Sequence, residues 1–269
     1  MQQSLTDIIS FAHHLADIAN LITKKYYRLS NGEMAKLDES PVTLADQEIE
    51  LAWRTEIKKH FPSHGIIGEE YSSHQEKADD LWVLDPIDGT SSFITGKPVF
   101  GNLIGFVSKQ KPVFGMINQP ITQERWFNNH NQEAIFNNQV IKTRNCHNLE
   151  DAVLCTTSPY FFYNSDAKVL ETLSKLTKYQ KIGGVIYGGD CYNYACLAMG
   201  FVDLIIEPGL KVYDFTAIIP IIQNAGGVVS DWYGEPLKLQ SNTKLLASAN
   251  HILHKKALKS LELLMPFSS

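Results

Sequence analysis

The segment LDPIDGT at residues 84–90 constrains this chain more than any other part of its sequence. It follows the apolar run 81–84, which predicts a short buried strand. Pro86 lacks a backbone donor and fixes its own φ, so we expect the chain to leave the strand directly after Asp85. Gly89 then permits a turn that other residues disfavour. The pattern predicts a strand that ends in a tight turn carrying carboxylates.

Two carboxylates, of Asp85 and Asp88, and the carbonyl oxygen of Ile87 are expected to converge at this turn. An oxygen-only set of ligands suits Mg²⁺ or Mn²⁺ and suits Zn²⁺ poorly. The alternative is an acidic turn in which the carboxylates only accept hydrogen bonds from nearby amides. This segment alone favours the second interpretation.

Further acidic residues stand at the edges of apolar runs. Glu69 and Glu70 follow the short apolar run 66–67, Asp214 precedes a mostly apolar helix start, and Asp46 lies further upstream. Each has an ordinary alternative, because adjacent acids are usually solvated and Asp214 or Asp46 could serve a helix N-terminus. Taken together, these acidic sites favour a metal centre.

Composition describes an ordinary globular chain of 269 residues, with 44% hydrophobic and 20% charged residues. The net charge is −5, which gives no support to binding of nucleic acid or membrane surfaces. No signal peptide or membrane-spanning stretch is visible, so we expect a cytoplasmic protein. Four cysteines without a C-x-x-C pair indicate structural thiols, and the scattered histidines are expected at the surface.

Hydrophobic periodicity predicts a strand-rich first half and an alternating second half. This pattern indicates an α+β chain with two layered sheets and helices between and outside them. We expect a single compact domain with subdomains at about 1–145 and 146–269. The expected helices include the one that starts at a capping box at Ser4, one that stops near Phe61, and 167–178, 192–199, 214–225 and 252–265; the expected strands are 65–68, 81–84, 102–108, 112–118, two within 125–142, 152–157, 204–207, 228–230 and 245–249.

The ordered motifs GEE at 68–70, DPIDGT at 85–90, and Tyr213-Asp214 followed by AGG at 225–227 give this chain its family resemblance. It resembles the inositol monophosphatase-like family, whose members are Mg²⁺-dependent, lithium-sensitive phosphomonoesterases. The resemblance covers nearly the whole chain. It implies the five-layer αβαβα sandwich of the inositol monophosphatase and fructose bisphosphatase type. We also expect a homodimer.

Within the family, the chain looks most similar to the histidinol-phosphate phosphatase branch. The motifs that suggest this are GNLIG at 101–105, QERW at 123–126, TTSP at 156–159, GGDCYNY at 188–194 and LKVYDF at 210–215. The resemblance implies hydrolysis of histidinol phosphate to histidinol and phosphate, a step of histidine biosynthesis. The alternatives are an inositol-1-monophosphatase or a broad sugar-phosphate phosphatase, and more remotely a non-catalytic phosphate-binding regulatory protein.

The family's pattern also implies the metal ligands. Two Mg²⁺ ions are expected, replaceable by Mn²⁺, with a third held more weakly; such ions neutralise the charge of a phosphate ester. The implied ligands are Glu69, Asp85 and the Ile87 carbonyl for the first ion, Asp85, Asp88 and Asp214 for the second, and Glu70 for the third.

The implied catalytic residues are Thr90, Asp46 and Glu69. Thr90 would orient the attacking water, and Asp46 would accept the proton from the Thr90 hydroxyl. The free N–H groups of the turn that begins at Gly89 can receive phosphate oxygens. The residues expected to bind substrate there are Asp88, Gly89, Thr90 and Ser91.

Specificity is expected from the second half of the chain. Glu207 ends an apolar strand and Asp190 follows two glycines. Either carboxylate could bind a cationic amine or imidazolium, as histidinol phosphate offers, or the hydroxyls of a sugar. Asp190 could instead cap the helix expected at 192–199.

Hydrolysis of a phosphomonoester is expected to require Mg²⁺ or Mn²⁺, because every expected ligand atom is an oxygen. A chelator should abolish phosphate release, and added Mg²⁺ should restore it. Lithium at millimolar levels should inhibit, an expectation that rests on the resemblance alone. Full activity in excess chelator would contradict the metal centre, whereas insensitivity to lithium would count only against the resemblance.

Overall fold

The structure is a computed structural model that describes residues 4–29, 41–163, 185–239 and 243–262. The chain forms two compact units, residues 1–140 with 213–221 and residues 141–212 with 222–269. The predicted division near residue 145 assigned 213–221 to the second subdomain, whereas this segment belongs to the first unit. That the units together make one domain stays a prediction. The helix predicted at 167–178 lies outside the described residues.

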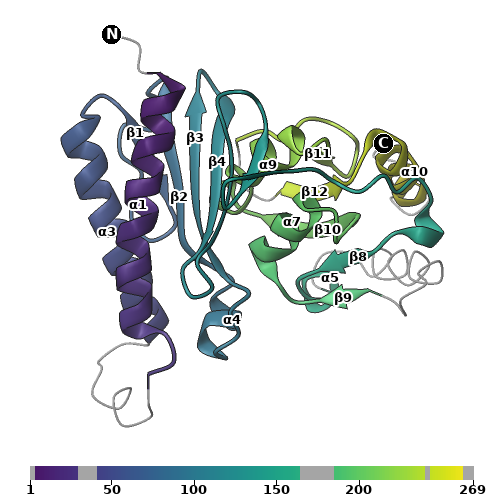
Figure 1. Ribbon diagram of the computed structural model, residues 1–269, viewed down its shortest axis with the longest axis horizontal. Coiled ribbons are helices and arrows are strands. Elements are labelled where there is room, and N and C mark those ends of the chain that lie inside the picture. Colours follow the sequence, from purple (N-terminus) through teal and green to yellow (C-terminus); the bar gives the residue numbers. More distant parts are fainter. Residues whose placement is uncertain (1–3, 30–40, 164–184, 240–242, 263–269) are drawn as a thin grey trace. The chain divides into compact units, whose positions relative to one another are not determined.

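The first unit is built on a mixed sheet whose described strands follow the order β1-β2-β3-β4-β5-β6-β7. β1 and β2 run parallel, and the pairings from β2 to β6 are antiparallel. The elements are α1 (Leu5–Tyr26), α3 (Pro41–His60), β1 (Gly65–Gly68), β2 (Asp80–Asp88), α4 (Thr90–Ile94), β3 (Gly101–Ser108), β4 (Lys111–Gln119), β5 (Glu124–Asn128), β6 (Ala134–Phe136) and β7 (Gln139–Ile141) (Figure 1).

Two strands were predicted within 125–142, and the structure has three. The additional break is a turn in which Asn129 donates its backbone N–H to the Glu133 carbonyl and accepts two backbone bonds with its side chain. Asparagine commonly stabilises such turns through its own side chain.

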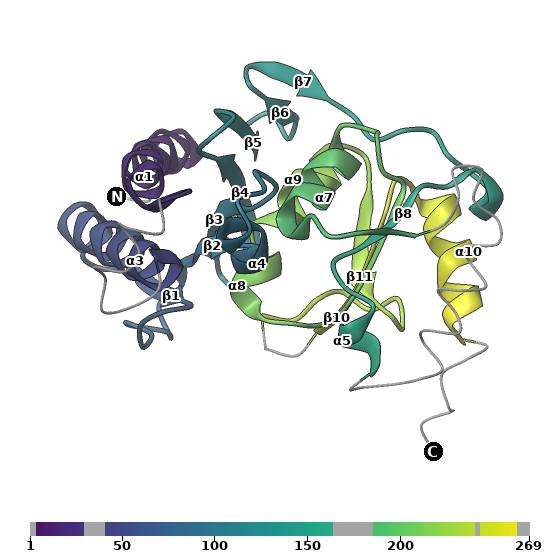
Figure 2. The same ribbon diagram turned by 90° about the horizontal axis from the view of Figure 1, so that it is seen from below.

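α1 and α3 lie side by side on one face of this sheet (Figure 2). α1 begins at the predicted capping box, in which Ser4 and Asp7 bond to each other's backbone. Trp53 of α3 is fully buried and donates its indole N–H to the Leu15 carbonyl at 2.8 Å. Burial of a large apolar side chain contributes about 1.5–3 kcal/mol, so this helix layer holds α3 firmly against the sheet.

The opposite face of the sheet receives residues 213–221. Ile104 and Phe106 belong to the core formed with α1 and α3, so Gly105 between them faces the other way. Gly105 pairs with Gly115 on β4, and a Cβ at Gly115 would lie 1.8 Å from the Ala217 carbonyl oxygen. The paired glycines therefore let the backbone of Ala217 rest directly on the strands.

This close approach corrects the prediction of one helix at 214–225. The structure has two short helices, α8 (Val212–Phe215) and α9 (Ile218–Asn224), separated at residues 216–217. Thr216 and Ala217 are buried over the glycine pair. Tertiary packing thus overrides the apolar pattern that predicted a continuous helix.

The second unit contains a mixed sheet whose described strands have the order β11-β12-β10-β8-β9. Leu253, Ala257 and Leu261 of α10 pack with Leu204 and Ile206 of β10 on one face, and α7 lies on the other (Figure 2). The elements are β8 (Leu154–Thr156), α5 (Tyr160–Tyr163), β9 (Ile186–Tyr187), α7 (Asp190–Ala198), β10 (Leu204–Leu210), β11 (Val228–Asp231), β12 (Thr243–Ser248) and α10 (His251–Glu262), with a 3₁₀ turn at Leu149–Asp151.

His254 of α10 is not the surface histidine that the sequence predicted. It is buried, and its two ring nitrogens bond with the hydroxyls of Ser230 and Ser248 at 2.8 and 2.9 Å. Burial lowers the pKa of His254 to about 4. The ring is therefore a neutral part of the core near pH 7. None of the helices in the described ranges is both long and apolar enough to cross a membrane.

Replacing Gly115 with alanine should destabilise the first unit, because its new methyl group would overlap the Ala217 carbonyl. Overpacking of this kind costs about 1–3 kcal/mol. Chemical denaturation followed by tryptophan fluorescence would measure the loss. Gly209→Ala is a comparison for strain without a clash, because Gly209 has a positive φ, which Gly115 lacks, and no atom within 4 Å of an added Cβ. A loss near zero in Gly115→Ala would show that the segment with Ala217 moves aside at no cost, which contradicts the tight contact.

Candidate active site

The DPID segment does not leave its strand after Asp85, which corrects the first expectation. β2 continues to Asp88, and its register with β3 shifts between Asp85, which pairs with Leu103, and Asp88, which pairs with Gly101. Pro86 cannot donate to the ladder, and proline within a sheet is tolerated at such a bulge. Residues three apart in a regular strand face opposite sides. The bulge instead lets both carboxylates point to the same side.

Three carboxylates meet at this bulge. Each of Asp85, Asp88 and Asp214 offers an oxygen atom, and these atoms all lie within 4.8 Å of one another. Asp214 comes from α8, on the segment that rests on the glycine pair. The three residues form a cluster of the kind that holds a metal ion, and all its atoms are hard oxygen donors.

Asp85 is the buried centre of the cluster. Its side chain is 2% exposed, and its Oδ1 atom has no hydrogen-bond partner among the described residues. Burial raises the pKa of Asp85 well above its usual value, and the charges of Glu69 and Asp88 raise it further. A buried carboxylate oxygen without a partner is costly, and a divalent cation would satisfy it. The residues therefore fit a bound cation.

The loop after β1 brings two more acids. Glu69 lies within hydrogen-bonding reach of Asp85, and burial of its carboxyl together with the charge of Asp214 raises the pKa of Glu69 to about 7. Burial and the nearby Glu50 also raise the pKa of Glu70. Both predicted ligands thus lie in the same negative field as the three-carboxylate cluster, although neither belongs to it.

Asp46 of α3 is buried close to this loop. Its Oδ1 atom has no hydrogen-bond partner in the described part of the chain, and burial with the charges of Glu70, Glu69 and Glu50 raises the pKa of Asp46 to about 9. The expected hydrogen bond from Thr90 to Asp46 is not formed. The Thr90 hydroxyl donates instead to the Ile87 carbonyl at 3.4 Å.

The structure has a turn where the sequence predicted one that binds phosphate, and phosphate binding there stays a prediction. Gly89 has φ +90° and precedes α4, a helix of only five residues that begins at Thr90. Thr90 and Ser91 are exposed and Asp88 is half-buried. The left-handed conformation explains the glycine, because other residues are strained there.

Asn102 and Asn118 support the bulge, and the sequence reasoning assigned them no role. The Asn102 amide donates to the Pro86 carbonyl and accepts from the Asn118 amide at 2.7 Å. Asn118 also donates to Asn20 of α1 and accepts from Arg125. Both Asn102 and Asn118 are buried. Two polar residues in apolar strands were the available signal, because buried amides must find partners.

The predicted specificity residues belong to the second unit. Glu207 of β10 is buried and accepts bonds from the Thr157 N–H and hydroxyl at 2.6 and 2.8 Å. Burial raises the pKa of Glu207 to about 7. Asp190 is half-buried, has φ +41° and begins α7. Glu207 thus has a structural role, because it accepts the hydrogen bonds that hold the end of β8 at residues 156–157. Substrate binding by Glu207 stays a prediction.

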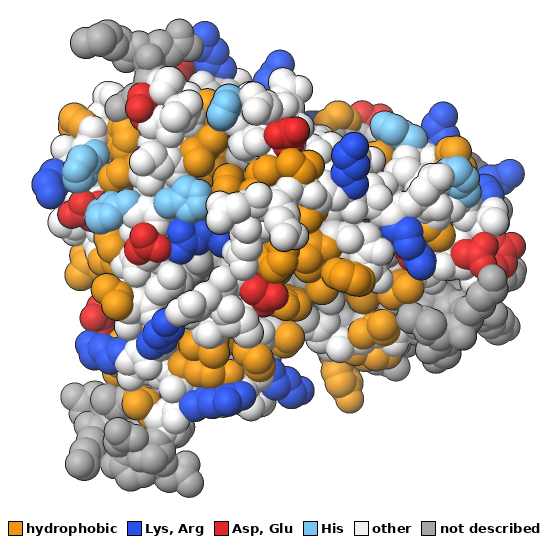
Figure 3. All heavy atoms as spheres, viewed as in Figure 1, with side chains coloured by type: hydrophobic (Ala, Val, Ile, Leu, Met, Phe, Trp, Pro, Cys, Tyr) orange, Lys and Arg blue, Asp and Glu red, His pale blue; other side chains and the backbone are white. Residues whose placement is uncertain are grey.

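A group of histidines and a cavity, both among the described residues, do not offer the metal-binding chemistry of the aspartate cluster. Histidines gather over the upper part of α1 and α3 (Figure 3), where His14 and His60 flank Glu56 at 3.3 and 3.5 Å. Among the described residues, however, the spacing that a metal ion needs occurs only in the aspartate cluster.

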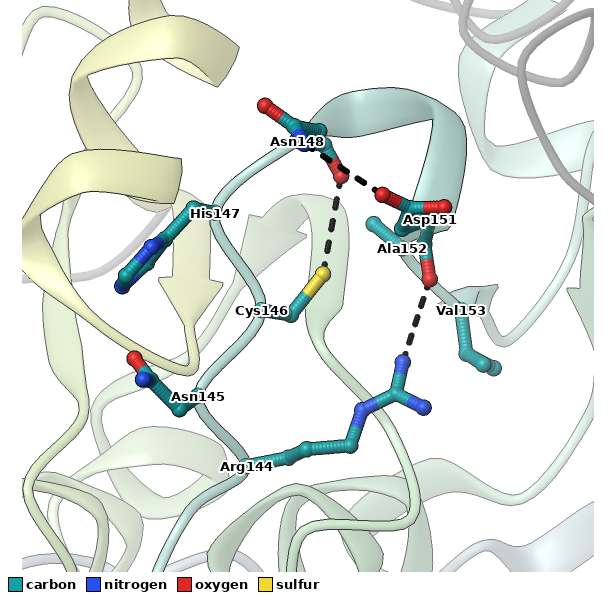
Figure 4. Close-up of a pocket in the computed structure, with 8 residues that line it drawn as sticks. All are labelled: Arg144, Asn145, Cys146, His147, Asn148, Asp151, Ala152 and Val153. Carbon is teal, nitrogen blue, oxygen red and sulfur yellow. Dashed lines mark hydrogen bonds between the residues drawn. The ribbon is translucent and has the colours of Figure 1, made fainter.

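A cavity of about 540 Å³ lies along residues 144–153 of the second unit (Figure 4). Arg144 lines it, but its charge is matched by the buried Asp203, and it also donates to the Asp151 carbonyl. The Cys146 thiol donates to the Asn148 carbonyl at 3.5 Å. No predicted site residue lines this cavity.

The fold is an α+β layered sandwich, and its candidate site is an acidic cluster of the kind that holds a metal ion. A sequence profile described as the inositol monophosphatase family matches residues 4–265, and the chain belongs to this family. It is a phosphoric monoester hydrolase.

Three relatives illustrate the range of the family. The chain is 44% identical over 257 residues to the "bifunctional phosphatase IMPL2, chloroplastic" of Arabidopsis thaliana, covering 92% of this chain and 73% of that protein. It is 29% identical over 252 residues to a histidinol-phosphatase of Chlorobaculum parvum, covering 93% and 94%. The structure of an inositol monophosphatase from Zymomonas mobilis matches with a TM-score of 0.87 at 41% identity, covering 97% of this chain and 100% of that one. The predicted fold class is confirmed by such solved structures.

Asp85→Asn is expected to be the most damaging change of one carboxylate, because Asp85 is central to the cluster. Turnover should fall about 10²–10³-fold, the usual range for loss of one electrostatic contact to a transition state. The rise in melting temperature on adding Mg²⁺ should shrink as well, since the stabilisation by a bound ligand falls as its dissociation constant rises above the ligand concentration.

Asp79→Asn is the control, because Asp79 is exposed just before β2 and undergoes the same change of charge. Its turnover and its Mg²⁺-dependent melting temperature should match those of the wild type. Wild-type turnover in Asp85→Asn would end the assignment of Asp85 as the shared ligand.

Proposed function

We propose that this chain is a Mg²⁺-dependent phosphatase that hydrolyses histidinol phosphate to histidinol and phosphate. The observation that carries the proposal is the meeting of Asp85, Asp88 and Asp214 around a buried carboxylate oxygen without a partner. Glu69 and Glu70, which share their negative field, complete the proposed ligands with the Ile87 carbonyl. Bound Mg²⁺ would neutralise the phosphate dianion and lower the pKa of the attacking water.

The protein's own groups have separate proposed roles. The carboxylates hold the cations, and the N–H groups of the turn from Gly89 to Ser91 receive phosphate oxygens. The Thr90 hydroxyl, which donates to the Ile87 carbonyl in this structure, would turn to orient the attacking water, with Asp46 as the proposed acceptor of its proton. Burial, together with the charges of Glu70, Glu69 and Glu50, raises the pKa of Asp46 to about 9. Bound cations would offset the charges and so lower this pKa toward the ionised carboxylate that this role needs.

Support for histidinol phosphate comes from two directions. Relatives named histidinol-phosphatase from Chlorobaculum parvum and Streptomyces coelicolor are 29% and 28% identical to this chain. The second unit also offers the acidic residues Asp190 and Glu207, and the charge of Asp190 reaches Glu207. An ammonium or imidazolium group would bind such carboxylates through charge-assisted hydrogen bonds.

An inositol monophosphate is the second candidate substrate. The observation that favours it is the 41% identity to the Zymomonas mobilis inositol monophosphatase over nearly the whole of both chains. Release of phosphate from histidinol phosphate and from inositol 1-phosphate, measured side by side with Mg²⁺, decides between them. We expect the higher kcat/KM for histidinol phosphate.

A homodimer in the cytoplasm remains a prediction, although the Arabidopsis relative is named chloroplastic.

Asp190→Asn is expected to lower kcat/KM for histidinol phosphate well beyond its effect on inositol 1-phosphate. Loss of one charge-assisted bond in a desolvated site costs about 1.5–3 kcal/mol, which is about 10- to 100-fold in kcat/KM. Inositol 1-phosphate has no cation to lose, so its value should change little.

Asp151→Asn provides the matched control, because it makes the same charge change in the second unit at a residue with no proposed role in binding. Both kcat/KM values should stay at the wild-type level. Equal losses on the two substrates in Asp190→Asn would show that Asp190 supports α7 and does not select the substrate.

A further inference from the structure

α3 carries a column of charged residues toward the loop that holds Glu69 and Glu70. Asp46, Glu50 and Arg54 are spaced four apart, so they share one face of the helix. Glu50 is fully buried and Arg54 is 7% exposed. Asp46 belongs to the site already described, whereas Glu50 and Arg54 have no role in the proposed chemistry.

Glu50 and Arg54 bind each other and the loop at the same time. The Glu50 Oε1 atom lies 2.7 Å from Arg54 Nε, and the Glu50 carboxylate accepts the N–H groups of Glu70 and Tyr71 at 2.8 and 3.3 Å. Arg54 donates its two terminal nitrogens to the carbonyls of Tyr71 and Ser72 at 2.9 and 3.0 Å. The backbone of residues 70–72 is therefore held by four hydrogen bonds from one ion pair.

The glycine of the GEE motif fits this arrangement. A Cβ at Gly68 would lie 2.1 Å from the Glu50 Oε1 atom. No side chain could occupy that position without displacing the carboxylate. The end of β1 and helix α3 thus approach each other so closely that the Glu50 carboxylate limits the path of the loop after Gly68.

A buried ion pair is a weak source of stability, because removing two charges from water offsets most of their attraction. The directed hydrogen bonds of this pair all go to backbone atoms next to proposed metal ligands. We infer that the Glu50–Arg54 pair is a positioning device that sets the places of the Glu69 and Glu70 carboxylates and thereby the affinity for divalent cations. This inference rests on the proposed function in that it takes these two residues as metal ligands.

The test separates positioning from stability with a double variant, Glu50→Gln with Arg54→Met. Arg54→Met alone would leave a buried unpaired charge and could unfold the protein, whereas the double variant removes both charges and should fold. Binding of Mn²⁺, measured by titration calorimetry, needs no substrate. We expect Mn²⁺ affinity to fall about 10- to 100-fold, as for other residues that orient metal ligands.

The same shift should appear in the Mg²⁺ concentration for half-maximal activity, while kcat at saturating Mg²⁺ stays close to that of the wild type. Glu50→Gln alone leaves the Arg54 charge without its ion-pair partner but keeps the Arg54 bonds to the Tyr71 and Ser72 carbonyls, so it should lower both the melting temperature and the Mn²⁺ affinity. A folded double variant with the Mn²⁺ affinity of the wild type would overturn the inference, whatever its melting temperature.

Trp53→Phe is the control for general destabilisation, because Trp53 lies on the same helix but bonds to Leu15 and not to the loop. It should lower the melting temperature and leave Mn²⁺ affinity unchanged. An equal loss of affinity in this control would mean that any weakening of α3 loosens the metal ligands, which contradicts a specific role for the pair. A wild-type chain that binds Mn²⁺ but hydrolyses no phosphomonoester would end the proposed function and leave the pair's role to be judged on affinity alone.

Discussion

Mutual repulsion among the carboxylates around Asp85 is the constraint on which the rest of the site depends. Asp85 is buried, and the charges of Glu69, Asp88 and Asp214 all disfavour its ionised form. Like charges at such distances interact strongly because little water screens them. The fold must therefore hold these groups together against their repulsion, and a divalent cation is the natural counter-charge. The repulsion that the fold must overcome is thus the same feature that would favour a bound cation.

Packing away from the carboxylates counters this repulsion. Asn102 bonds to the Pro86 carbonyl and so secures the bulge that turns Asp85 and Asp88 to one side. The pair Gly105 and Gly115 lets the segment with Asp214 rest on the strands. Both contacts hold the backbone near a carboxylate and do not bond to the carboxylate itself. The Asp85 Oδ1 atom keeps no hydrogen-bond partner among the described residues, while contacts of the neighbouring backbone determine where this carboxylate lies.

The proposed metal ligands and the proposed specificity residues belong to different units. The proposed metal ligands all belong to the first unit, which includes Asp214 despite its late position in the sequence. Asp190 and Glu207 belong to the second. Sites on a shared fold can keep one chemistry while substrate-facing residues vary. Relatives named for histidinol phosphate and for inositol phosphate are both similar to this chain, which agrees with such a division.

The sequence by itself determined the elements whose signals are local. The capping box at Ser4, the periodicity of α1 and the apolar runs of the strands predicted elements that the structure contains. The acids at the ends of apolar runs identified the cluster. Only tertiary structure decided that β2 continues through Pro86, that the 214–225 helix breaks, and that His254 is buried. Local patterns encode backbone preference, whereas these outcomes depend on partners from distant segments, whose contacts outweigh propensities of a fraction of a kcal/mol per residue.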